Sequence, residues 1–172
     1  MRYAVLYSSG TGNTEQVARA ICAALPAGQA RLEAVGPDTA APEEEVLFLG
    51  FWTDKGTCPP AMQALFAKLA GKQVVLFGTA GFGGSPAYFD SILQRTQALL
   101  PAGNTVLGGW MCQGKMPPAV RARYEAMAAQ NPGDPKVAGF LANFDQALSH
   151  PDQADLAAAA AFAAEMAEKA GN

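Results

Sequence analysis

Histidine and cysteine are scarce in this sequence, with one histidine, His150, and three widely spaced cysteines, Cys22, Cys58 and Cys112. Metal centres built on imidazole and thiolate ligands need several such residues at short spacings, and no such pattern occurs here. A single histidine also gives no catalytic triad, and its place just before Pro151 favours a local hydrogen bond. We therefore predict no metal site, no catalytic side chain, and reduced thiols in a cytoplasmic protein.

Long apolar runs and strong charge are missing as well. No apolar run approaches the roughly 20 residues of a membrane-spanning helix, and no charged-then-apolar leader precedes the first strand-like run. The net charge of −3 argues against nucleic acid or a membrane as the main partner. The 172 residues fit one domain, residues 1–172, with a substantial core.

The chain does contain a regular alternation of strand and helix patterns. Continuous apolar runs at 46–51 and 74–77 are typical of strands covered on both faces. The alternation predicts an α/β fold, a doubly wound, five-stranded parallel sheet with helices on both faces. Strands are expected at 3–7, 30–35, 46–51, 72–78 and 104–111, and helices at 17–25, 60–69, 87–100, 121–129, 137–148 and 152–170.

Small and hydroxylated residues, Ser8 to Thr14, join the first strand to the first helix. The free N–H groups and positive dipole end of a helix start bind phosphate, and hydroxyl and amide side chains add donors. No lysine occurs between Arg2 and Lys55, which excludes a nucleoside triphosphate loop. Glu15 stands where a dinucleotide fingerprint needs its third glycine. The loop therefore suits a single phosphomonoester held by neutral donors.

The pattern Ser-x-Thr-Gly-Asn-Thr after the first strand resembles the FMN-phosphate loop of the flavodoxin family. The resemblance implies strand order 2-1-3-4-5 and FMN held by the loops after strands 1, 3 and 4, and glycine-rich loops do follow strands 3 and 4. The FMN-binding residues predicted in this way are Ser8, Ser9, Gly10, Thr11, Gly12, Asn13, Thr14, Trp52, Thr53, Asp54, Lys55, Gly56, Thr79, Ala80, Gly81, Phe82 and Gly83.

Several of these residues have two interpretations. Trp52 either stacks on the flavin or packs at the strand end, and Lys55 either approaches flavin N1 or is a solvated surface lysine. Gly56 is expected to offer its carbonyl to flavin N5, as the equivalent family loop does. Either Phe82 or Tyr88 is expected to cover the second face of the ring. Family members usually carry a tyrosine in the loop after strand 4, where this chain has Phe82. Tyr88 fits a core position in the helix that follows.

Cys112-Gln113-Gly114-Lys115-Met116 follows the fifth strand, and with the Gly-Phe-Trp-Thr-Asp-Lys-Gly-Thr loop it resembles a divergent flavodoxin-like branch of anaerobic bacteria. Some members of that branch accompany flavin or iron–sulfur reductases, including enzymes of tetrapyrrole reduction. Residues 113–151 form a family-specific helical insertion after strand 5. Cys112 is expected to be a small buried residue, and Lys115 and Met116 fit a docking surface.

Together these features favour an FMN-binding electron-transfer protein, a monomer or weak dimer that donates electrons to a partner reductase. One alternative is an NAD(P)H-dependent FMN or quinone reductase of the same fold, with a substrate pocket built by 113–150. A second alternative is an interaction subunit that has lost its flavin, which the four hydroxyl donors of the first loop argue against.

Overall fold

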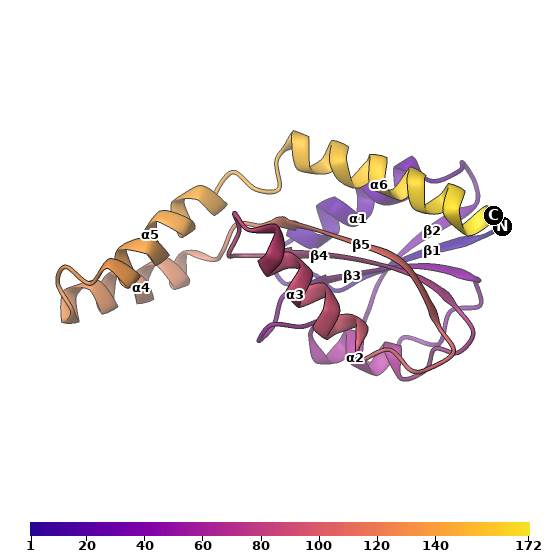
Figure 1. The fold of residues 1–172 in the computed structure, drawn as a ribbon, viewed down its shortest axis with the longest axis horizontal. Coiled ribbons are helices and arrows are strands. Elements are labelled where there is room, and N and C mark those ends of the chain that lie inside the picture. The colour runs from indigo at the N-terminus through magenta and orange to yellow at the C-terminus, as the bar shows by residue number, and fades with distance from the viewer.

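A parallel sheet of five strands forms the centre of the computed structural model, which describes residues 1–172 (Figure 1). The strand order is β2-β1-β3-β4-β5, so the predicted fold class and order are confirmed. The strands are β1 (Tyr3–Tyr7), β2 (Ala30–Ala34), β3 (Val46–Trp52), β4 (Gln73–Ala80) and β5 (Thr105–Gln113). Every residue of β1 is buried, and all but the last residue of β3 are, as expected for strands covered on both faces.

Two pairs of helices cover the sheet (Figure 1). Helices α1 (Asn13–Ala24) and α6 (Gln153–Gly171) pack on one face, and α2 (Pro60–Phe66) and α3 (Pro86–Gln97) on the other. The helix expected at 60–69 ends at Phe66, because the next residues tighten into turns in which Lys68 N–H bonds to Leu65 and Leu69 N–H to Phe66. No helix has the length and apolar content needed to cross a bilayer.

The predicted insertion after β5 is a hairpin of two helices, α4 (Pro118–Gln130) and α5 (Pro135–Ala147). We call residues 118–147 the arm. Helix α4 begins three residues before its predicted start, because proline fits the first turn of a helix. The arm extends away from the sheet at the end where the strands finish (Figure 1). Its base is closed by a hydrogen bond of 2.8 Å from the Lys115 N–H to the His150 carbonyl.

Two glycine–phenylalanine pairs lie where β3 and β4 approach their carboxyl ends. Gly50 pairs with Phe77, and Phe51 pairs with Gly78. Each ring covers the glycine beside it: a Cβ added to Gly50 would lie 2.1 Å from the Phe77 ring, and one added to Gly78 would lie 2.9 Å from the Phe51 ring. Phe77 belongs to the core under α1 and α6, and Phe51 to the core under α2 and α3. The pairs therefore fix the strand register on both faces at once.

We expect Gly50→Ala to destabilise the protein by about 3 kcal/mol, because the new methyl group overlaps the fully buried Phe77 ring. Gly139→Ala on the exposed face of α5 is the matched control, since an added Cβ there meets nothing within 4 Å. That control should raise stability by roughly 0.5–1 kcal/mol, because alanine favours helix. Urea unfolding followed by circular dichroism measures both, and equal effects would contradict the packing described.

Candidate functional site

The loop between β1 and α1 presents backbone donors at the start of α1. The Ser9 hydroxyl oxygen accepts the N–H groups of Gly12 at 3.1 Å and Glu15 at 3.4 Å, which holds the loop closed. Gly12 has φ 90°, a left-handed conformation that favours glycine. The N–H groups of Ser9, Gly10 and Thr11 donate to no protein atom, and Gly10 and Thr11 are exposed. These N–H groups next to the start of α1 are free to bind an anion.

The first two residues of α1 are tied to the segment that follows β5 and to the end of β4. The Asn13 side chain donates from Nδ2 to the Lys115 carbonyl at 2.8 Å, while its buried Oδ1 has no partner in the protein. The Thr14 and Thr79 hydroxyls are 2.9 Å apart and buried. The structure thus places the Thr79 hydroxyl beneath the first loop, bonded to Thr14.

The last residue of β3 is Trp52, which is 36% exposed. A Cβ added to Gly10 would lie 3.9 Å from the Trp52 indole, so the Trp52 side chain lies beside the loop between β1 and α1. The backbone N–H and the hydroxyl of Thr53 both donate to the Thr79 carbonyl at 2.9 Å. These two hydrogen bonds join the carboxyl ends of β3 and β4, close to where the loops after the two strands begin.

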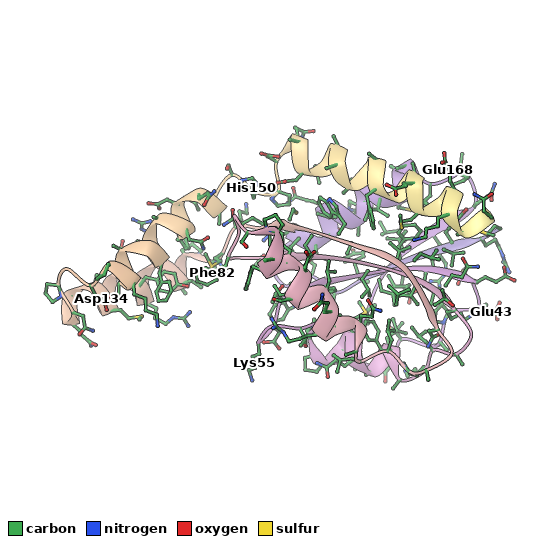
Figure 2. All side chains as sticks on the ribbon, viewed as in Figure 1. Glu43, Lys55, Phe82, Asp134, His150 and Glu168 are labelled. Atoms are coloured by element: carbon green, nitrogen blue, oxygen red, sulfur yellow. The ribbon has the colours of Figure 1, made fainter.

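A tight turn, closed by two hydrogen bonds between Asp54 and Thr57, follows Thr53. Both central residues have positive φ, 49° at Lys55 and 84° at Gly56. Lys55 is exposed and projects from this end of the sheet (Figure 2). The Gly56 carbonyl accepts a hydrogen bond of 3.0 Å from Nε of Arg95, a partner that the sequence did not suggest. One further acceptor position remains on that oxygen.

The loop after β4 is held from the side of β5 and the arm. Phe82 packs edge-to-face on Phe140 of α5, with 5.8 Å between ring centroids, and remains 37% exposed (Figure 2). Phe140 lies in turn against Tyr124 of α4 at 5.2 Å. Tyr88 packs against the core under α2 and α3, where the sequence suggested it would lie.

The segment Gln113 to Met116 lies between these loops, a role that the sequence did not reveal. A Cβ on Gly81 would lie 2.6 Å from the Met116 side chain, and one on Gly83 2.7 Å from Gln113. A Cβ on Gly114 would lie 2.6 Å from the Asn13 amide. These three glycines therefore allow the close approach of neighbouring segments. The presence of these glycines in the loop after β4 and directly after β5 was the only feature of the sequence that could have indicated this role.

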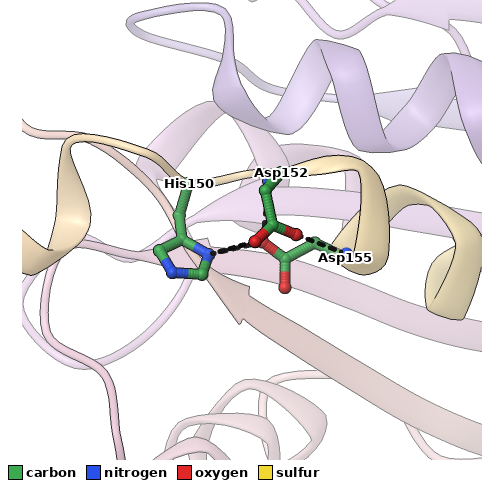
Figure 3. A group of neighbouring side chains, drawn as sticks. All are labelled: His150, Asp152 and Asp155. Carbon is green, nitrogen blue, oxygen red and sulfur yellow. Dashed lines mark hydrogen bonds and ion pairs between the residues drawn. The ribbon is translucent and has the colours of Figure 1, made fainter.

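His150, Asp152 and Asp155 form a polar group between the arm and α6 (Figure 3). The Asp152 and Asp155 side chains accept each other's backbone N–H at 2.9 Å, a capping box that starts α6. His150 Nδ1 lies 2.6 Å from Asp155 Oδ2, which is the local hydrogen bond expected from the sequence. The bond from the Asp155 N–H holds the pKa of Asp152 below its ordinary value. The contacts of these three residues are therefore accounted for by the capping of α6.

Three comparisons with known proteins agree with this geometry. A family model described as flavodoxin domain matches residues 4–164. The flavodoxin-like domain-containing protein BilS of Clostridium symbiosum is 39% identical over 178 residues, covering 92% of each chain. BilS of Clostridioides difficile is 32% identical over 175 residues, covering 99% of this chain and 98% of that protein. The structure of oxidised flavodoxin 2 from Bacillus cereus has a TM-score of 0.63 and 19% identity, covering 98% and 99% of the chains, which is a likeness of fold.

The three cysteines are free thiols. Burial raises the pKa of Cys58 to about 12 and raises that of Cys112 further, with the nearby Asp155 and Asp152 carboxylates adding to the Cys112 shift. Cys22 is half-buried, and burial raises its pKa as well. Since the thiolate is the reactive form, Cys112 has the properties of the small buried residue that was predicted.

We expect iodoacetamide at pH 8 to alkylate Cys22 first and to leave Cys58 and Cys112 unmodified in the folded protein. A higher pKa leaves less thiolate at a given pH, and burial blocks access. Peptide mass spectrometry gives the order of modification, and all three should react in denaturant. Early labelling of Cys112 would contradict the assignment.

Proposed function

This chain belongs to the flavodoxin family, and we propose that it binds FMN and transfers electrons to a partner reductase. The observation that carries the proposal is the loop between β1 and α1. Its free N–H groups at Ser9, Gly10 and Thr11 offer what a phosphomonoester needs: several neutral donors at a helix start with no competing acceptor. Free thiols fit the cytoplasm, where such a carrier would act.

The chain's other loops suit a flavin ring beside that phosphate. Trp52 is exposed next to Gly10 and supplies a flat apolar face. The N–H groups of Gly81 and Phe82 donate to no protein atom, and the buried Oδ1 of Asn13 lacks a donor. The two N–H groups suit the oxygen atoms of the FMN ring, and the Asn13 Oδ1 acceptor suits a hydroxyl group of the ribityl chain. When bound, FMN supplies the electron chemistry, and the protein holds the ring and sets its environment.

The distribution of groups favours a carrier over a stand-alone enzyme. The two thiols whose pKa is strongly raised, Cys58 and Cys112, are both buried, so neither offers an accessible nucleophile. Trp52, the last residue of β3, and Phe82, in the loop after β4, are both exposed at the carboxyl end of the sheet, which carries the arm. We propose that a partner protein covers this end and takes electrons there.

Thr11→Ala should weaken FMN binding about tenfold or more and leave riboflavin binding nearly unchanged, because one charge-assisted hydrogen bond to the phosphate is lost. Fluorescence titration with each flavin measures both constants. Thr105→Ala, an exposed threonine at the far end of β5, is the matched control. Equal losses for both flavins would show that the loop does not bind phosphate. Thr11 is preferable to Thr14, whose removal also leaves the buried Thr79 hydroxyl unpaired.

An anaerobic titration of the FMN-loaded protein with dithionite, and separately with NADPH and NADH, distinguishes the possible functions. A carrier is expected to be reduced by dithionite and to resist both nicotinamides until a reductase is added. Rapid reduction by NADPH or NADH alone would instead support an NAD(P)H-dependent reductase. Failure to bind FMN would overturn the proposal and favour an interaction subunit.

A further inference from the structure

A side chain of the arm holds the backbone of the loop after β4. The Gly81 carbonyl accepts two hydrogen bonds of 3.0 Å, one from Nε2 of Gln113 and one from Nδ2 of Asn143 in α5. The Asn143 Oδ1 atom accepts from Gln113 Nε2 at 3.0 Å and from the Gly83 N–H at 3.4 Å. Gln113 is buried and Asn143 is half-buried, so these contacts are partly shielded from solvent. We call Gln113 and Asn143 the clamp.

The clamp fixes the direction of the next N–H group. A trans peptide is planar, so the Phe82 N–H points away from the Gly81 carbonyl, and the only cis peptide in the chain is His150–Pro151. The Ala80 carbonyl accepts from the Gly114 N–H at 2.9 Å, which turns the Gly81 N–H in the same direction. Gln113 and Gly114 come from the end of β5, on the side of β4 away from β3, and Asn143 is bonded to Gln113. Both free N–H groups therefore face the β3 side, where the Trp52–Thr57 loop begins.

We propose that Gln113 and Asn143 are positioning residues that aim the Gly81 and Phe82 N–H groups at the flavin ring and so favour its reduced form. This inference rests on the proposed function, because it concerns the ring of the bound FMN. The clamp itself does not touch the ring.

The effect follows from the charge that the ring gains on reduction. Electrons added to the ring increase negative charge on its pyrimidine nitrogen and oxygen atoms, and a hydrogen bond to a more negative acceptor is stronger. Donors that are already oriented cost nothing to reorganise. Oriented Gly81 and Phe82 N–H groups therefore stabilise reduced FMN more than oxidised FMN. A clamp that did not orient these N–H groups would affect both forms equally.

Asn143→Ala removes the arm's part of the clamp, and Gln113→Met removes the second donor with a side chain of similar length suited to a buried site. Gln146→Ala is the matched control, because it deletes an exposed amide on the same helix whose side chain bonds to nothing. The measurement is the dissociation constant of each purified protein for oxidised FMN and, anaerobically, for fully reduced FMN. Circular dichroism confirms that each variant retains its helices.

We expect Asn143→Ala and Gln113→Met each to weaken binding of reduced FMN about tenfold and of oxidised FMN only about threefold, with no change for Gln146→Ala. The Phe82 and Gly81 amide resonances should shift on FMN binding in the wild type and shift less in both variants. Equal losses for the two oxidation states, or none, would overturn the positioning role while leaving FMN binding intact. A wild type that binds no FMN would overturn the proposed function and this inference together.

Discussion

The register of β3 against β4 is the constraint on which the rest of the structure depends. Phe77 lies over Gly50 on one face of the sheet, and Phe51 lies over Gly78 on the other. A slip of one residue in one direction would pair Phe51 with Phe77, and a slip in the other direction would pair Gly50 with Gly78, so either slip would break both ring-on-glycine contacts. The next pair in register is Trp52 and Thr79, so the loops after β3 and β4 start at the same height along the sheet. Two ring-on-glycine contacts thus decide where the side chains of the site lie.

The segment from Gln113 to Met116 connects the parts of the site. Its backbone and side chains contact the loop after β4 through Gly81 and Gly83, and the loop after β1 through Asn13. It also leads directly into the arm. The glycines that the sequence marks as flavin-loop residues therefore have a second role, which is to let this segment approach. An additional Cβ at any of these points would push the loops apart.

The elements of the fold are predictable from the sequence because each has a local signal. Apolar runs mark β3 and β4, proline marks the start of α2, and small hydroxylated residues mark the first loop. The contacts that complete the site have no such signal. Asn143 meets Gly81 across 62 residues, and Arg95 meets Gly56 across 39. Such pairs depend on how helices pack, which hydrophobic periodicity along one segment does not specify.

The arm has little core of its own. Tyr124 is the one buried residue of α4, and Val137, Phe144 and Ala147 are those of α5. Segments with few buried contacts open locally at a lower free energy than the central strands, and their amide hydrogens exchange sooner. Because Asn143 belongs to the arm, each such opening also removes one of the two donors to the Gly81 carbonyl and leaves the Gln113 side chain as the other. The order of the loop after β4 therefore depends in part on the local stability of two helices that lie outside the sheet.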